Sequence, residues 1–230
     1  MVVTGANRGI GRAIAEAFVA AGDTVSTVYR GGDLPDGVTG AIADITDTDA
    51  VNAAFDELEA AHGRVRVLIA NAGITRDGLL MRMSDADFED VINTNLTGTF
   101  RTVRRAVTSM VREKYGRIVL VGSVVGLLGN PGQVNYSSSK SALVGMARSI
   151  TREVGSRGIT ANVIAPGFIT TDMTAQLGDD VVKQYEQSIP AKRFGSTAEV
   201  AAAAVYLASD AAGYVSGAVV PVDGGLGMGH

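Results

Sequence analysis

The chain contains no cysteine and no tryptophan, and only two of its 230 residues are histidine. Without cysteine, disulfides, thiolate zinc sites, iron–sulfur clusters and cysteine nucleophiles are excluded together. His62 precedes a glycine at a predicted helix end and His230 is the last residue, so a Ser-His-Asp mechanism is hard to build. We therefore expect neither a metal site nor a hydrolase of that type.

The chain also has no large excess of positive or negative charge and no long apolar run. The net charge is −4, which gives no general reason to expect nucleic-acid binding. The start of the chain has neither a basic leader nor a cleavable apolar stretch, and the alanine-rich run at residues 200–208 is far too short to span a bilayer. We expect a soluble, cytoplasmic protein with no membrane span.

Apolar residues make up 46% of the chain, which is enough for one buried domain covering residues 1–230. Short β-branched runs alternate with helical patterns, which is typical of repeated βαβ units and predicts an α/β, doubly wound Rossmann fold. The expected seven-stranded parallel sheet has helices on both faces. Its strands lie near residues 2–4, 24–29, 40–44, 65–70, 117–122, 160–164 and 218–222, with helices near 10–21, 49–62, 85–112, 135–155 and 198–208. Residues 166–195 fit no clean period and are expected to form a long connection with one or two short helices that serves as a substrate lid.

A glycine-rich segment follows the first predicted strand and opens the first predicted helix. Gly5, Gly9 and Gly11 can form a tight turn that aims free helix N–H groups at a pyrophosphate. The second strand ends at Arg30, where an NAD enzyme would normally carry an acidic residue. Arg30 and Arg8 can bind a 2′-phosphate instead, so NADPH is the favoured cofactor.

Two further strand ends complete the expected cofactor cleft. Asp44 and Ile45 follow the third strand, where a carboxylate can meet the adenine amino group. Asn71, Ala72 and Gly73 follow the fourth, where small residues allow a close approach to the backbone. Because these segments lie at the carboxyl ends of successive strands, they predict a crevice at the switch point of the sheet.

A candidate catalytic constellation follows the fifth strand. Ser123 ends that strand, and Tyr136 and Lys140 are four residues apart on one predicted helix, which places them on the same face. We expect Lys140 to lower the pKa of Tyr136, so that Tyr136 gives a proton to a carbonyl oxygen held by Ser123 while hydride arrives from the nicotinamide. Asn95 lies inside a long helical pattern, where its amide can bend the helix and hold a water in a proton relay to Lys140.

Together these motifs resemble those of the short-chain dehydrogenase/reductases over essentially the whole chain. The matching elements are the glycine loop, Asn71-Ala72-Gly73, Asn95, Ser123, Tyr136-x3-Lys140 and Pro166-Gly167. The resemblance implies the strand order 3-2-1-4-5-6-7 and a catalytic tetrad of Asn95, Ser123, Tyr136 and Lys140. The full set of expected cofactor-binding residues is Gly5, Asn7, Arg8, Gly9, Ile10, Gly11, Arg30, Asp44, Ile45, Asn71, Ala72, Gly73, Tyr136, Lys140, Pro166, Gly167, Ile169 and Thr171.

Within that superfamily, the segments around Ser123, the stretch at residues 166–174 and the glycine-rich end are similar to the 3-oxoacyl-[acyl-carrier-protein] reductases, in particular their actinobacterial branch. This implies reduction of carrier-linked 3-oxoacyl chains in fatty-acid elongation. It also implies a homotetramer built through the predicted helices 85–112 and 135–155 and the last strand.

A basic docking surface for an acidic acyl carrier protein is expected beside the cleft. Lys114 and Arg157 match positions where related reductases carry carrier-binding residues, and Arg112, Arg117, Arg148 and Arg152 lie in the same two clusters. Both clusters are expected to flank the cleft.

Two alternatives remain open from the sequence. A different carbonyl substrate is the main one, such as a 3-oxoacyl-CoA, a sugar or a quinone, because fold and tetrad do not fix the substrate. The second is a dinucleotide-sensing regulatory protein without chemistry, against which the intact tetrad argues.

Overall fold

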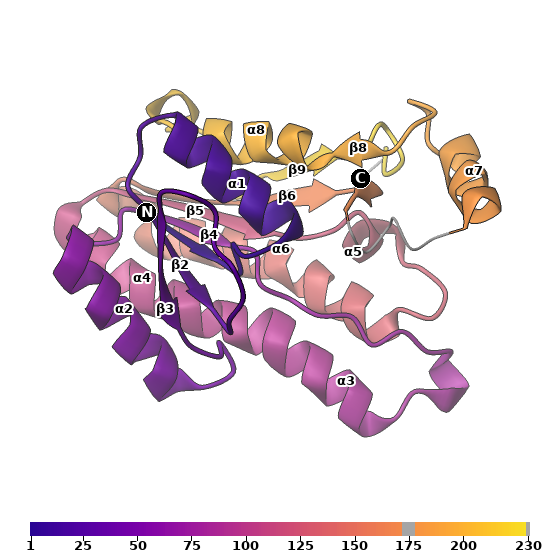
Figure 1. Ribbon diagram of the computed structural model, residues 1–230, viewed down its shortest axis with the longest axis horizontal. Helices are drawn as coiled ribbons and strands as arrows, with labels where there is room; N and C mark the ends of the chain where they lie inside the picture. The colour runs from indigo at the N-terminus through magenta and orange to yellow at the C-terminus, as the bar shows by residue number, and fades with distance from the viewer. Residues whose placement is uncertain (172–177, 229–230) are drawn as a thin grey trace.

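The computed structural model describes residues 1–171 and 178–228. Seven parallel strands form the main sheet in the order β3-β2-β1-β4-β5-β6-β9 (Figure 1). These strands are β1 (Val2–Thr4), β2 (Val25–Tyr29), β3 (Val38–Ile42), β4 (Val67–Ala70), β5 (Gly116–Val121), β6 (Ile159–Pro166) and β9 (Val219–Val222). The predicted Rossmann fold and its strand order are therefore confirmed.

Helices cover both faces of this sheet. In Figure 1, α1 (Gly9–Ala20) and α8 (Thr197–Ala208) lie on one face, and α2 (Thr48–His62), α4 (Thr99–Glu113) and α6 (Val134–Val154) lie on the other. The remaining helical elements are α3 (Asp85–Ile92), α5 (Val125–Leu128), α7 (Asp179–Ser188), the π-helix Asn93–Gly98 and the 3₁₀ turns Leu80–Arg82, Gly155–Arg157 and Asp210–Ala212. None of the described helices is both long and apolar enough to cross a bilayer.

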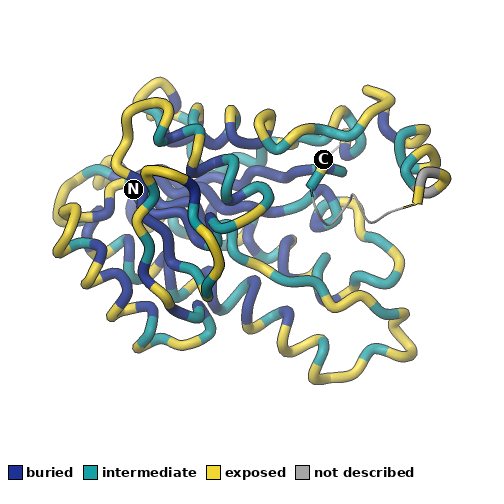
Figure 2. The backbone as a smooth tube through the Cα atoms, in the orientation of Figure 1, coloured by how far each residue is buried: buried dark blue, intermediate teal, exposed yellow. Residues whose placement is uncertain are grey.

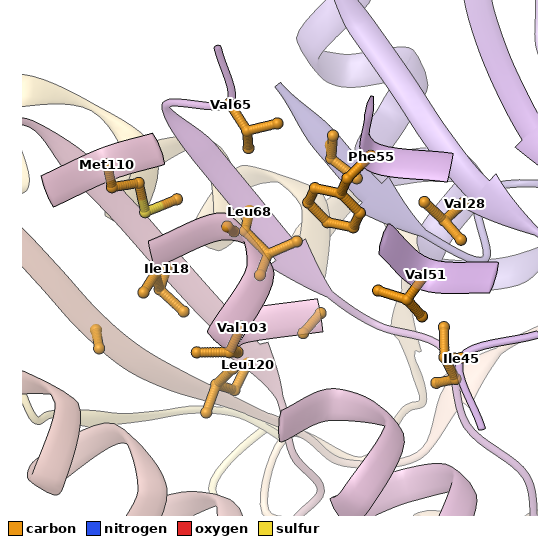
Figure 3. Packing of buried hydrophobic residues seen from close by; sticks show 14 of the residues in the cluster. Val28, Ile45, Val51, Phe55, Val65, Leu68, Val103, Met110, Ile118 and Leu120 are labelled. Carbon is orange, nitrogen blue, oxygen red and sulfur yellow. The ribbon is translucent and has the colours of Figure 1, made fainter. Parts of the chain in front are cut away.

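Each face of the sheet has its own apolar cluster, because strands covered on both sides need side chains buried in both directions. Every residue of β5 and β6 is buried, and Figure 2 shows the buried backbone concentrated in the sheet. On the α2–α4 side, Phe55 packs with Val51, Leu68, Val103 and other members of the cluster (Figure 3). These layers hold the strand ends, and therefore the loops beyond them, in fixed positions.

The predicted third strand is placed two residues too late. The strand occupies Val38–Ile42, and Gly40 pairs with Thr27 of β2. A Cβ on Gly40 would lie 2.6 Å from the Tyr29 ring, so glycine is needed inside the strand rather than at its start.

The predicted helix at residues 85–112 is three elements rather than one. The π-helix Asn93–Gly98 interrupts it between α3 and α4, at the point where Asn95 was expected to bend the helix. Side-chain hydrogen bonds accompany the change, because Thr99 Oγ1 donates to the Asn95 carbonyl (2.8 Å). A wider turn of this kind is frequent at functional sites.

The long connection after β6 contains the short helix α7, as expected from the sequence, and also a pair of short strands that was not predicted. The short strands β7 (Ile169–Thr170) and β8 (Gly195–Ser196) pair in parallel, and α7 stands beyond the carboxyl ends of the main strands (Figure 1). Phe168 stacks on Tyr185 of α7 and on Phe194, with ring centroids 4.2 and 5.5 Å apart. Asp172, Met173 and Thr174 of the family-like segment, and His230, lie outside the described residues.

Candidate active site

A cleft of about 580 Å³ opens at the carboxyl ends of the central strands. Loops that follow β1, β4, β5 and β6 form its walls, as the doubly wound topology predicts. All the expected cofactor-binding residues line it except Asp44 and Ile45, and Ser123 lines it too. The structure thus brings together residues that are up to 166 positions apart, from Gly5 to Thr171.

The glycine loop is held open by contacts that leave no room for side chains. Gly5 and Gly9 have φ values of 70° and 54°, which favour glycine. A Cβ on Gly11 would lie 2.3 Å from the Gly5 carbonyl oxygen and 2.4 Å from Asn71 Nδ2. Asn71 Nδ2 in turn donates to the Thr4 and Gly5 carbonyls at 3.0 and 3.3 Å. A loop of this shape fits the pyrophosphate of a dinucleotide, and Gly5, Gly9 and Gly11 with the backbone around them would hold it.

Arg30 lines the cleft and its side chain is exposed. Its nearest acidic partner is Asp44, at 3.8 Å. Asp44 also accepts hydrogen bonds from the Thr46 backbone and hydroxyl, both at 2.8 Å. Burial acts to raise the pKa of Asp44, but the Thr46 hydrogen bonds and the Arg30 charge outweigh it and lower the pKa.

Asp44 and Ile45 differ from expectation, because neither of them lines the cleft. β3 ends at Ile42, so Asp44 lies two residues beyond the strand and turns toward Thr46 and Arg30. Ile45 is a buried core residue, and a Cβ on Gly98 would lie 2.7 Å from it.

Ser123, Tyr136 and Lys140 converge on the substrate end of the cleft. The Ser123 side chain hydrogen-bonds Tyr136, and its Oγ also accepts from the Val125 amide at 3.2 Å. Lys140 Nζ lies 5.6 Å from the centre of the Tyr136 ring and donates to the Val121 carbonyl at 2.8 Å. One turn of α6 thus presents the phenol and the ammonium to the strand end that carries Ser123.

Burial is the main cause of the pKa shifts of Tyr136 and Lys140. Burial raises the pKa of Tyr136, the Ser123 hydrogen bond lowers it, and the Asp77 charge raises it further. The net direction is upward because burial is the largest cause, so the overall lowering of the Tyr136 pKa expected from the sequence is wrong. Burial also lowers the pKa of Lys140 to about 8. A phenol with a raised pKa keeps its proton at neutral pH, which suits a proton donor.

Asn95 lies behind the cleft rather than on its surface. Its Oδ1 accepts from the Ile74 amide at 2.8 Å, and its Nδ2 donates to the Ile74 carbonyl at 2.9 Å and to Ser139 Oγ at 3.1 Å. The side chain is 0% exposed, and it hydrogen-bonds Ile74 and Ser139 rather than Lys140. In this structure its amide joins the β4–α3 connection to α6.

Six further residues line the cleft and were not predicted. They are Ile74, Thr75, Thr94, Val121, Gly122 and Phe168. Each is adjacent to a predicted motif or to another member of this set, so extending every motif by one or two residues would have found them.

The expected basic clusters do not flank the cleft of their own chain. Lys114 and Arg157 precede β5 and β6, and therefore lie at the amino edge of the sheet, opposite the carboxyl edge where the cleft opens. Arg117 is only 6% exposed. It donates to the Gly158 carbonyl at 3.1 Å and pairs with Asp210 at 3.3 Å, so it fastens the start of β5.

Comparison with known proteins agrees with this geometry. Residues 5–227 match the family model described as enoyl-(acyl carrier protein) reductase. The chain is 52% identical over its full length to the 3-oxoacyl-[acyl-carrier-protein] reductase MabA of Mycobacterium tuberculosis, covering 93% of that protein. It is 50% identical to MabA of Mycobacterium avium, with 90% of that protein covered. It is 45% identical to FabG of Escherichia coli, another 3-oxoacyl-[acyl-carrier-protein] reductase, over 99% of this chain and 96% of the relative. With the glycine loop, Ser123, Tyr136 and Lys140 all in place, the chain belongs to the short-chain dehydrogenase/reductases, in the family of the 3-oxoacyl-[acyl-carrier-protein] reductases.

Proposed function

We propose that this protein reduces the 3-oxo group of acyl chains linked to acyl carrier protein, with NADPH, in cytoplasmic fatty-acid elongation. The observation that carries the proposal is the convergence of Ser123, Tyr136 and Lys140 on one cleft with the glycine loop. The choice of substrate is supported by the relatives MabA and FabG, which are 3-oxoacyl-[acyl-carrier-protein] reductases and match over nearly the whole chain.

The roles of the side chains follow from their positions. When bound, NADPH supplies the hydride that reduces the carbonyl carbon. Ser123 donates a hydrogen bond to the ketone oxygen, and Tyr136 gives that oxygen its proton, so that the ketone becomes a secondary alcohol and Tyr136 regains a proton from solvent. Lys140 stabilises the phenolate that Tyr136 leaves. The start of the connection after β6 lines the cleft at Pro166–Ile169 and Thr171.

NADPH consumption tests this function directly. The measurement compares 3-oxoacyl chains on acyl carrier protein with the same chains on coenzyme A. Higher kcat/KM on the carrier-linked chains supports the proposal, and higher kcat/KM on the CoA-linked chains favours the alternative of a 3-oxoacyl-CoA reductase. If no ketone in a wide panel drives NADPH consumption, the protein is not a reductase of this kind.

Arg30 is expected to set the preference for NADPH over NADH. A hydrogen bond from a guanidinium to a phosphate contributes about 1.5–3 kcal/mol, so kcat/KM for NADPH should exceed that for NADH by roughly tenfold to a hundredfold. Arg30→Asp should abolish or invert this ratio, because a carboxylate repels the phosphate and accepts from a ribose hydroxyl. Equal kcat/KM values for the two cofactors in the wild-type protein would show that Arg30 does not bind the 2′-phosphate of NADPH.

The position of Lys114 and Arg157 at the amino edge indicates how they can serve a cleft at the opposite edge. α6 runs from the carboxyl edge, at Tyr136, to the amino edge. A twofold axis perpendicular to α4 and α6 would pair these helices antiparallel with those of a second copy, which would bring the amino edge of one copy near the cleft of the other. We propose a homotetramer in which Lys114 and Arg157 bind the acidic carrier for the neighbouring cleft.

Charge reversal at these two residues tests carrier binding. Lys114→Glu with Arg157→Glu should lower kcat/KM for carrier-linked substrate several-fold, most strongly at low ionic strength, because such contacts mainly speed encounter and are screened by salt. A short CoA or N-acetylcysteamine thioester should be reduced almost as before. Equal losses on both substrates would contradict a docking role, and a sedimentation mass near 23.7 kDa would contradict the assembly.

A further inference from the structure

The peptide groups on both sides of Tyr136 are held by buried side chains. On the amino side, Asn135 Oδ1 accepts from the Tyr136 amide at 2.8 Å. On the carboxyl side, Ser139 Oγ donates to the Tyr136 carbonyl at 2.7 Å. Asn135 and Ser139 are both 0% exposed, so neither hydrogen bond competes with solvent.

Each of these side chains is also hydrogen-bonded to residues 74–76, Asn135 directly and Ser139 through Asn95. Asn135 Nδ2 donates to the Arg76 carbonyl at 2.8 Å and more weakly to the Asp87 carbonyl of α3 at 3.3 Å. Ser139 Oγ accepts from Asn95 Nδ2, and the Asn95 amide pairs with both backbone groups of Ile74. Two short hydrogen-bonded chains therefore join residues 74–76 to the backbone of Tyr136.

Local helix formation does not require this arrangement. Gln133, at the N-cap of α6, makes no side-chain capping hydrogen bond, and the Tyr136 amide belongs to the first turn, where amides have no partner within the helix. The Asn135 side-chain oxygen is that partner, and it comes from within the helix. The Asn135 side-chain nitrogen donates outside α6, to the Arg76 and Asp87 carbonyls. A solvated side chain at residue 135 would leave α6 equally helical, so the buried amide serves the placement of the helix rather than its formation.

We propose that Asn135 and Ser139 are positioning residues for Tyr136, which fix its backbone against the cleft wall at Ile74–Arg76 and so aim the phenol at Ser123. This inference rests on the proposed function, in which Tyr136 is the proton donor. Asn135 and Ser139 do not contact substrate in this proposal, and they affect the reaction only through Tyr136. Since a misplacement of about 1 Å can cost as much as 100-fold in rate, the loss of either chain should slow turnover without emptying the cleft.

The test compares single substitutions with matched controls. Asn135→Ala and Ser139→Ala each remove one of the two chains, and Ser139→Ala is the milder change because alanine favours a helix. Asn162→Ala is the control for the first, because Asn162 is also 0% exposed and its amide also joins two backbone groups, Val215 and Ala218. Ser138→Ala is the control for the second, since Ser138 is the exposed neighbour on the same turn.

We expect kcat to fall by about tenfold or more in Asn135→Ala and Ser139→Ala, with the Kd for NADPH within about threefold of wild type. Asn162→Ala should lose thermal stability to a similar degree as Asn135→Ala and yet keep its kcat. If Asn135→Ala and Ser139→Ala retain wild-type kcat while Tyr136→Phe is inactive, the positioning role is wrong and the proposed function stands.

A measurement without substrate separates the two proposals. The difference in phenolate absorbance between each protein and its Tyr136→Phe form isolates the titration of Tyr136. In Asn135→Ala and Ser139→Ala the midpoint should differ from that of the wild-type protein, because the burial and the Ser123 hydrogen bond that shift the Tyr136 pKa both depend on the placement of the ring. An unchanged midpoint in both variants overturns the positioning role, whether or not the wild-type protein reduces a 3-oxoacyl thioester.

Discussion

Replacing Tyr136 by phenylalanine should lower kcat for 3-oxoacyl reduction by at least about 100-fold, the lower end of what a positioned general acid contributes. The substitution removes only the hydroxyl that hydrogen-bonds Ser123. The ring keeps its place on α6, and Lys140 keeps its hydrogen bond to Val121. Cofactor binding, measured by NADPH fluorescence, and the melting temperature should therefore remain near wild type.

Tyr214→Phe is the matched control for this substitution. Tyr214 is fully exposed, so the same chemical change there should leave kcat unaltered. Turnover of Tyr136→Phe within a few-fold of wild type would mean that another group gives the proton, and the role assigned to Tyr136 would have to be abandoned.

Among the glycines of the loop, Gly11 should be the one at which replacement by alanine disturbs the cofactor site most. The new Cβ would overlap the Gly5 carbonyl oxygen at 2.3 Å and Asn71 Nδ2 at 2.4 Å, two atoms that hydrogen-bond each other. Relief requires the backbone of the loop to move. Overpacking of this kind costs about 1–3 kcal/mol, which for a chain of this size lowers the melting temperature by roughly 2–12 °C.

Because the displaced atoms form the dinucleotide cradle, we also expect the Kd for NADPH to rise at least about tenfold, measured by fluorescence titration. Gly155→Ala is the control, since Gly155 has helical backbone angles of −58° and −35° and no atom within 4 Å of an added Cβ. Its melting temperature should be unchanged or slightly higher. A Gly11→Ala protein that binds NADPH as tightly as wild type would rule out this account of the loop.

The sequence predicted well those elements whose structure is determined by residues close together in the chain. The apolar stretches Ile118–Val121 of β5 and Val163–Ala165 of β6 favour strands covered on both faces, and every residue of both strands is buried. The glycine loop and the pair Tyr136 and Lys140 follow from turn geometry and helix spacing. These patterns fix which loops meet at the carboxyl edge, and the cleft follows from them.

The features that sequence reasoning missed depend on contacts between distant segments. The π-helix around Asn95 accompanies hydrogen bonds to Ile74 and Ser139, which lie 21 and 44 residues away. Ile45 looks like a strand-end residue until the packing against Gly98 is known. Arg117 reads as a surface charge, and only the fold brings Asp210 to it. The direction of the Tyr136 pKa likewise depends on burial, which spacing alone does not give.

The wall formed by Pro166 and Gly167 has a consequence for the making of the protein on the ribosome. The Gly167 amide donates to the Val222 carbonyl at 3.0 Å, and β6 pairs with β9, which is the last strand of the chain. Residues 1–70 bring four neighbouring strands and the glycine loop early in synthesis, but the outer edge of β6 has no partner strand until residue 222 has emerged. A message cut short before that codon therefore yields a chain with the catalytic helix present and the edge of β6 bare, a template for pairing with other chains and a target for quality control.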